Sequence, residues 1–252
     1  MLTNYQNMSD FNRESTLHAQ LKQLYAGPSG QVEIPIGSFI CDCRTSYGEL
    51  IEIQTGSFGP LKSKLHLIAQ NHQIRIVHPI IRNRYIETYS ANNVLLRNRR
   101  SPKKGSIWDV FKALIYAPEL VLNRNIIVEL VALDIVDKRL DDGKGSWRRK
   151  GISLEDKKML SIHGTLPLQY PEEYRAFVPF SIDETFTIRD LYTYCKEVKL
   201  KQETITEPAF SRPELEPLEY GTAQKSVYVL HRIGLLERIG KRGNFYLYRK
   251  SI

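Results

Sequence analysis

The stretch FICDCRTSYGELIEIQTG, residues 39–56, decides the fold of this chain, because two strand patterns meet there across a short turn. Residues 39–44 and 49–54 are short apolar runs that favour strands, and residues 46–48 have the polar and glycine-containing character of a turn. Residues 31–36 form a further strand pattern. The three strands are close enough in sequence to pair as an antiparallel meander.

Two acidic side chains, Asp42 and Glu52, lie on neighbouring strands of this hairpin. Glu52 and Gln54 share one face of their strand, because side chains alternate between the faces. Two close carboxylates repel each other unless a cation joins them, and hard oxygen ligands favour Mg²⁺ or Mn²⁺. We therefore predict that Asp42 and Glu52 are metal ligands. The alternative for the same residues is a solvated edge of an α/β sheet.

A helix expected over residues 10–25 adds a third carboxylate. Glu14 lies on the same helical stripe as Leu17 and Leu21, and His18 also lies there. A carboxylate on the side that packs against the sheet needs a partner, because burying it alone is costly. The spacing therefore directs Glu14 towards the hairpin.

The order of the elements resembles a known family. A helix follows the hairpin and leads to an apolar strand over residues 73–81, which such a crossover makes parallel to a neighbour. Helix with Glu, strand, strand with Asp, strand with Glu-x-Lys, helix and strand is the order in the PD-(D/E)xK nuclease superfamily, which includes many restriction enzymes and Holliday-junction resolvases. Residues 10–90 are similar to it. The resemblance implies a restriction-endonuclease-like α/β fold, a mixed sheet flanked by helices, with Glu14 as the helical acid and Asp42 and Glu52 as the metal ligands.

The chain departs from this family at the lysine position, where Gln54 stands. Gln54 cannot offer a positive charge to the phosphate, and Cys41 replaces the proline that precedes the family's Asp. Some branches recruit a lysine from a neighbouring helix. Lys64 flanks the apolar stripe of the next helix and is the candidate here, whereas Lys62 points further away and Lys22 lies off the first helix's stripe.

The resemblance implies a metal-dependent DNA endonuclease that hydrolyses phosphodiester bonds, with Mg²⁺ or Mn²⁺ as its cofactor. Gln54 would orient the water and Lys64 would neutralise the developing charge. Enzymes of this superfamily often dimerise to cut two strands, so a homodimer is a further expectation. Two alternatives stay open: a catalytically inactive nuclease fold acting as a DNA-binding regulator, and a protein-interaction subunit of a larger complex.

The end of the chain, TAQKSVYVLHRIGLLERIGKRGNFYLYRK at residues 222–250, combines a helix with a basic-tipped hairpin. Strands expected over residues 235–239 and 244–249 flank the basic turn, and the arrangement resembles the winged-helix family. In that family a helix presents side chains to the major groove and the wing reaches the phosphates. The resemblance implies DNA contacts by Thr222, Gln224, Lys225, Lys241 and Arg242. The alternative is a winged helix used for protein contact.

The chain is basic, with 36 Lys and Arg against 28 Asp and Glu, a formal net charge of +8 and a pI of about 9.3. The charge is clustered, and one cluster surrounds Trp147. Clustered basic charge beside an aromatic side chain favours a polyanion partner over an ordinary solvated surface. We expect Arg148, Arg149 and Lys150 to bind nucleic acid.

Three units are expected: a nuclease-like α/β domain at residues 1–97, a β-containing extension with a basic loop at residues 98–182, and a winged-helix module at residues 183–252. Within them, Ser153 with Asp156 and Thr187 with Asp190 have the spacing of capping boxes, which predicts a helix after each. The expected elements of the middle unit are a basic connector over residues 98–105, a helix over 106–122 broken at Pro118, and strands over 125–138 and 160–168.

The composition also bounds the location. No run approaches the roughly 18 apolar residues that a membrane span requires, and the first ten residues lack the apolar core of a signal peptide. Three cysteines do not make a disulfide framework. We expect a cytoplasmic protein with reduced thiols.

Overall fold

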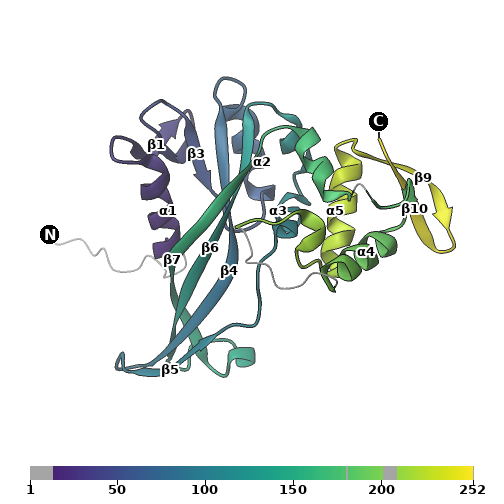
Figure 1. Ribbon diagram of the computed structural model, residues 1–252. Coiled ribbons are helices and arrows are strands. Elements are labelled where there is room, and N and C mark those ends of the chain that lie inside the picture. Colours follow the sequence, from purple (N-terminus) through teal and green to yellow (C-terminus); the bar gives the residue numbers. More distant parts are fainter. Residues whose placement is uncertain (1–13, 180, 201–208, 252) are drawn as a thin grey trace.

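A large mixed sheet flanked by helices forms the body of the protein (Figure 1). The computed structural model describes residues 14–179, 181–200 and 209–251. The strand order is β1-β2-β3-β4-β6-β7, and β5 pairs with the outer part of β4. The strands are β1 (Gln31–Ile36), β2 (Phe39–Arg44), β3 (Leu50–Ile53), β4 (Ile74–Ser90), β5 (Leu95–Arg100), β6 (Ile126–Asp141) and β7 (Ile152–Leu168).

The first part of the sheet confirms the expected meander. β1, β2 and β3 pair antiparallel, and β4 lies parallel to β3 after a helical crossover. That crossover consists of a short 3-10 turn, η1 (Gly59–Leu61), and helix α2 (Lys62–Ile68). Pro60 lies in the first turn of this crossover, where the missing N–H costs nothing.

Three strands are unusually long. β4, β6 and β7 have 17, 16 and 17 residues, whereas most strands have about 3–10. The strand expected over residues 73–81 continues to Ser90, because β6 pairs with β4 along its whole length. The outer halves of these strands, together with β5, project beyond the rest of the sheet (Figure 1).

Helices cover both faces of the sheet. Helix α1 (Thr16–Ala26) packs Leu17 and Leu21 against one face, in a core that contains Ile51 and Val131. The other face carries α2, the short helices η2 (Ile107–Asp109), α3 (Val110–Leu114), η3 (Pro118–Leu122) and η5 (Pro171–Phe177), and the C-terminal helices. The helix expected over residues 106–122 is therefore three short helices, of which the third begins at Pro118 as expected.

The helix expected after Ser153 is wrong, because that segment belongs to β7. β7 pairs antiparallel with β6, and Asp156 lies opposite Lys138. The Asp156 carboxylate instead accepts a hydrogen bond from the Thr16 amide at 2.9 Å, at the start of α1. Long-range pairing with β6 outweighs the local capping pattern here.

The C-terminal part consists of β8 (Thr185–Phe186), α4 (Ile188–Leu200), η6 (Pro213–Leu215), α5 (Tyr220–Arg232), β9 (Leu236–Arg242) and β10 (Phe245–Lys250). The capping box at the start of α4 is confirmed: Thr187 N–H donates to Asp190 at 2.8 Å, and Asp190 N–H donates to the Thr187 hydroxyl at 3.3 Å. β8, β10 and β9 form a small antiparallel sheet. Residues 201–208, between α4 and η6, lie outside the described residues.

The three expected units share structure. The boundary expected between residues 97 and 98 falls inside β5, and β6 and β7 of the expected extension continue the first sheet. Buried side chains of the C-terminal part, such as Leu191 and Val227, join the core that packs on the sheet. None of the described helices combines the length and apolar character needed to cross a membrane.

Candidate functional site

The sheet opens between β2 and β3 at the predicted acidic residues. Their backbone pairing covers Arg44 with Leu50 and Cys43 with Ile51, and it goes no further. One residue beyond, the Asp42 side chain takes the place of a backbone acceptor: the Ile53 N–H donates to its carboxylate at 2.7 Å. This fork fixes one Asp42 oxygen between the strands.

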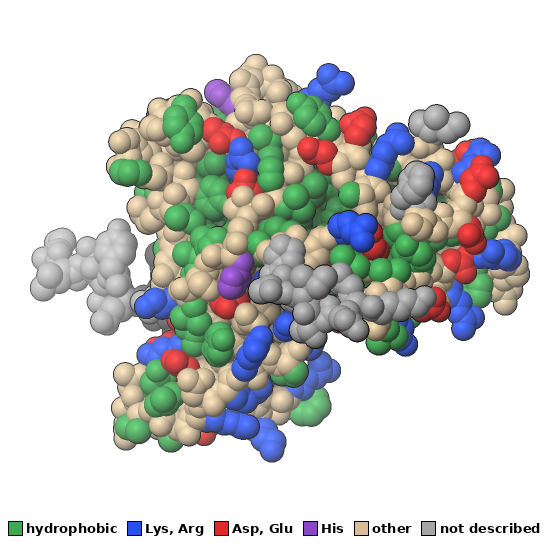
Figure 2. Space-filling model, in the orientation of Figure 1, with side chains coloured by type: hydrophobic (Ala, Val, Ile, Leu, Met, Phe, Trp, Pro, Cys, Tyr) green, Lys and Arg blue, Asp and Glu red, His purple; other side chains and the backbone are tan. Residues whose placement is uncertain are grey.

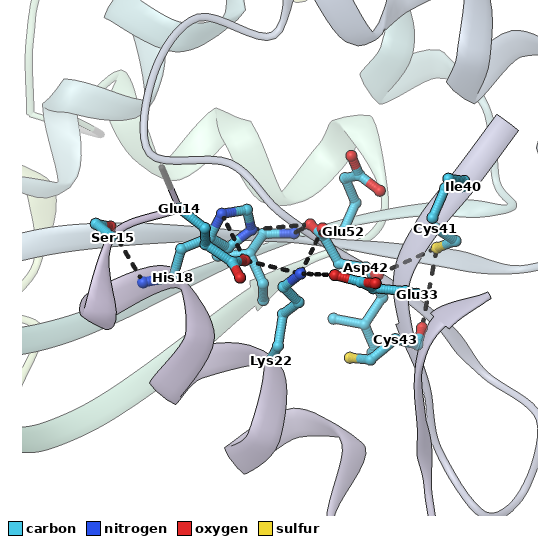
Figure 3. A network of polar contacts seen from close by, with 12 residues as sticks. Glu14, Ser15, His18, Lys22, Glu33, Ile40, Cys41, Asp42, Cys43 and Glu52 are labelled. Carbon is cyan, nitrogen blue, oxygen red and sulfur yellow. Dashed lines mark hydrogen bonds and ion pairs between the residues drawn. The ribbon is translucent and has the colours of Figure 1, made fainter. Parts of the chain in front are cut away.

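Helix α1 supplies two cationic or polar partners to Asp42 (Figure 3). His18 Nε2 lies 3.1 Å from one carboxylate oxygen, and Lys22 Nζ lies 3.9 Å from the other. Burial by itself raises the pKa of Asp42, but the hydrogen bonds from His18 and the Ile53 amide, with the charge of Lys22, bring that pKa below its ordinary value. Asp42 is therefore held as a carboxylate.

Helix α2 supplies the cation of Glu52. Lys64 Nζ donates to Glu52 Oε2 and to the Ile40 carbonyl, each at 2.5 Å. Glu52 is 6% exposed. Burial and the neighbouring negative charge of Asp42 raise the pKa of Glu52, and Lys64 opposes them. The site thus contains two coupled carboxylates, each with a lysine on its outer side.

Glu14 joins the site through two other side chains. Its carboxylate lies 2.7 Å from Lys22 Nζ and 3.3 Å from His18 Nδ1 (Figure 3). The expectation that Glu14 belongs to the helix is corrected, because α1 begins at Thr16 and Ser15 is its N-cap. Residues 10–13 of the expected helix lie outside the described residues.

Lys22 is a site residue that the stripe argument excluded. Its side chain is buried among three carboxylates, those of Glu14, Glu33 and Asp42. Burial lowers the pKa of Lys22, but these carboxylates more than offset that and hold it above its ordinary value. The signal was present in the sequence: Glu14, His18 and Lys22 are spaced by four, the interval at which side chains meet along a helix.

Gln54 is engaged elsewhere. Its side-chain amide donates to the Ser57 backbone carbonyl at 2.5 Å. The backbone carbonyl oxygen of Gln54 lies 2.7 Å from Nδ1 of the buried His78. Its backbone N–H continues the sheet to Val77. Gln54 therefore stabilises the turn after β3. The cation that pairs with Glu52 is Lys64.

The donor set suits a divalent ion bound by few protein ligands. Among the residues that the structure describes, no group of three or more His, Cys, Asp and Glu side chains is arranged to hold a metal. Asp42 and Glu52 provide two carboxylates whose mutual repulsion a cation would relieve. Mg²⁺ is commonly bound by one or two carboxylates, with water and substrate phosphate completing the shell. Asp42 and Glu52 fit that pattern.

The residues expected to contact DNA in the C-terminal part differ in exposure. Thr222 is 2% exposed and packs inside the module, so the expected DNA contact by Thr222 is wrong. Thr222 is buried in the first turn of α5, a helix that packs against α3 and α4. Gln224 is exposed and Lys225 is half-buried, whereas Lys241 lies over the Tyr246 ring and Arg242 pairs with Asp190.

The basic loop between β6 and β7 is open to solvent. Arg148, Arg149 and Lys150 are all exposed, and Trp147 beside them is 83% exposed. The Arg148 guanidinium lies 5.5 Å from the centre of the Trp147 ring. The structure therefore leaves this expected nucleic-acid surface available, at a distance along the sheet from the carboxylates.

One family match covers the large sheet together with Asp42, Glu52 and Lys64. A family model described as a domain of unknown function (DUF8091) matches residues 15–169. An uncharacterised protein of Treponema pallidum (strain Nichols) is 28% identical over 163 residues, which are 65% of this chain and 62% of the relative. The chain thus spans less than two thirds of that relative's length. No solved structure matches the chain.

Proposed function

The chain belongs to the DUF8091 family, and we propose that it is a metal-dependent DNA endonuclease with a site built on Asp42, Glu52 and Lys64. The observation that carries this proposal is the fork between β2 and β3, which brings two carboxylates together with a lysine beside each. The order α1, β1–β3 meander, α2 and parallel β4 supports a restriction-endonuclease-like arrangement.

Asp42 and Glu52 would hold Mg²⁺ or Mn²⁺. When bound, the ion would polarise the scissile phosphate and lower the pKa of the attacking water. The chain's own residues prepare the site, because the Ile53 amide and His18 fix the orientation of Asp42. Lys64 carries a positive charge at the edge of the carboxylate pair, where it would stabilise the negative charge that develops on the phosphate oxygens.

The C-terminal elements support a winged-helix-like module, since α5 is followed directly by the β9–β10 hairpin with Lys241 and Arg242 near its turn. We propose DNA contact for the hairpin and the exposed Gln224. Thr222 has a packing role instead. The burial of α5 against α3 and α4 favours the alternative use of this module as a scaffold for protein contact.

A second function has its own support. Both carboxylates already have an internal lysine partner, and the Gln54 amide is bound to Ser57. This balance of charge favours a nuclease fold that keeps DNA binding without cleavage, acting as a regulator. The two functions differ in their need for metal, because a regulator binds DNA equally well in a chelator.

The test is incubation of purified protein with supercoiled plasmid in Mg²⁺, in Mn²⁺ and in EDTA. Asp42→Asn keeps the size of the side chain and removes its charge, and Glu197→Gln, on the exposed face of α4, is the matched control. The nuclease predicts metal-dependent nicking that Asp42→Asn abolishes and Glu197→Gln retains. Full activity in Asp42→Asn would refute the site. Binding without nicking would favour the regulator, and absence of DNA binding would favour a protein-interaction subunit.

A further inference from the structure

We propose that the projecting end of the sheet is an arm that grips duplex DNA and leads it to the carboxylate site. The arm is defined as residues 83–104 and 136–158: the outer parts of β4, β6 and β7, with β5 and the basic loop. This inference rests on the proposed nuclease function in one respect: the arm leads DNA towards the carboxylates because they are proposed to cleave it. It assigns most of the DNA affinity to the arm and little to the C-terminal module.

The arm begins where the site ends. β3 stops at Ile53, which pairs with Val77 of β4, and β4 continues without β3 past this point to Ser90 while it stays paired with β6. At about 3.3 Å per residue, the continuation spans about 40 Å. β5 joins the edge of β4 that β3 has left, from Tyr85 onward. The same edge of β4 therefore carries β3, one side of the carboxylate fork, at its inner end and the basic strand β5 at its outer end.

The net positive charge of the protein is concentrated in the arm. Its residues include 14 Lys and Arg and 6 Asp and Glu, a net charge of +8 that equals the formal net charge of the whole chain. The remaining residues have 22 of each sign. The C-terminal module, residues 183–252, has 12 basic and 10 acidic residues and is nearly neutral. Figure 2 shows Lys and Arg side chains gathered over the end of the molecule where β5 lies.

The basic side chains at the outer end of the arm are available to a ligand. All six residues of β5 are exposed, and the loop between β6 and β7 is exposed over η4 (Trp147–Arg149). Within the described part of the chain, five of these cations have no acidic side chain paired with them: Arg97, Arg99, Arg148, Arg149 and Lys150. A polyanion can neutralise many such unpaired cations at once. Its binding is favoured further because the counterions condensed on the polyanion are released.

Duplex DNA fits this surface better than a lipid membrane. Outer β4 is paired with β5 on one edge and with β6 on the other, so the arm is the end of a sheet whose exposed cations can contact phosphates along a duplex. Trp147 on the basic loop suits contact with bases or sugars. The exposed Leu95 and Leu96 would suit lipid, but the cleavage site proposed at the base of the same strands acts on a nucleic-acid phosphodiester, which favours DNA. The arm is therefore assigned to DNA.

The experiment measures binding of a fluorescein-labelled DNA duplex in EDTA over a series of salt concentrations. Two double variants remove arm charges: Arg97→Ser with Arg99→Ser, and Arg148→Ser with Arg149→Ser. The control, Lys196→Ser with Lys199→Ser, removes the same charge from exposed positions of α4. A third double variant, Lys241→Ser with Arg242→Ser, tests the C-terminal hairpin. Circular dichroism checks that each variant is folded.

Each lost phosphate contact reduces the magnitude of the slope of log affinity against log salt by about 0.9. Each arm variant removes two cations, so its slope is expected to be smaller in magnitude by about 1.8. The control is expected to keep the wild-type slope. Wild-type slopes in both arm variants would overturn the proposal. A larger loss in the hairpin variant, or tighter binding to phosphatidylserine vesicles than to DNA, would overturn it as well. Because EDTA prevents cleavage, failure of the nuclease would leave this result unchanged, and the plasmid assay tests that function separately.

Discussion

Lys64 Nζ of α2 lies 2.5 Å from Glu52 Oε2 of β3, so the cation beside the second carboxylate comes from the helix that follows the strand. The strand itself carries Gln54 two residues after Glu52, and that amide is bound to Ser57. The pair is mostly buried, because the Lys64 and Glu52 side chains are 13% and 8% exposed. A lysine from outside the strand therefore supplies the positive charge beside Glu52.

Replacing Lys64 by Met is expected to lower the cleavage rate by about 10²–10³, the usual effect of removing one group that stabilises transition-state charge. Affinity for DNA in EDTA should change little, because the side chain lies at the carboxylates. Plasmid nicking under single-turnover conditions measures this effect. Lys62→Met is the matched control on the same helix, since Lys62 pairs with Glu119 at the surface. Equal rates for the two variants would contradict the role of Lys64.

Replacing Lys22 by Met is expected to destabilise the protein by about 3 kcal/mol, because it leaves a largely buried Asp42 without its nearby ammonium. The ion pair with Glu14 would be lost too, but Glu14 is more exposed and contributes less. Urea denaturation followed by circular dichroism gives the free energy of unfolding. Lys196→Met on exposed α4 should leave it unchanged. A Lys22→Met variant as stable as wild type would show that Asp42 needs no cation from α1.

The Asp134 carboxyl group is expected to make the folding stability depend on pH. Burial raises the pKa of its carboxyl, but hydrogen bonds from Asn83 and the contact with His163 at 2.9 Å bring that pKa below its ordinary value. A pKa lower in the folded than in the unfolded state stabilises the fold above the unfolded value of about 3.9, and this contribution is lost as the pH falls through the folded pKa. The difference in unfolding free energy between wild type and Asp134→Asn should be larger near about pH 6 than near about pH 3. A difference independent of pH would contradict the assignment.

The buried Thr222 side chain of α5 is expected to contribute to packing and not to DNA contact. Its hydroxyl is buried without a hydrogen-bond partner in the described structure. Thr222→Val keeps the shape and removes the unsatisfied group, and it should raise the unfolding free energy by about 1 kcal/mol. Thr222→Ser keeps the hydroxyl, loses a methyl group and should destabilise. DNA affinity should be unchanged in both variants; a specific loss of affinity would return Thr222 to the DNA surface.

Much of the site followed from short-range patterns. A turn of three residues sets β2 against β3, and their register then places Asp42 beside Glu52 without help from the rest of the chain. The capping box of Thr187 and Asp190 was equally local, because its two hydrogen bonds join residues three apart. Predictions of this kind depend on backbone geometry that a few consecutive residues determine.

The partners of the carboxylates were harder to predict. Lys22 lies off the apolar stripe of α1, yet it is buried, because the docking angle of the helix turns its edge towards β2. A helical wheel gives the angle of a side chain about its own axis, and the position of that axis over the sheet comes from packing. The burial of Thr222 has the same cause, since α5 packs between its neighbours.

The sequence by itself determined the hairpin, the acidic pair within it, the crossover to a parallel strand and the basic character of the chain, because these follow from local alternation, turns and charge counts. Only the tertiary structure decided that Lys22 lies beside Asp42 and that the basic segments form one arm. Residues 153–156 show the physical reason. Their local pattern favours a helix, but pairing with the full length of β6 makes them part of a strand, and that pairing carries the basic loop out to the end of the sheet beside β5.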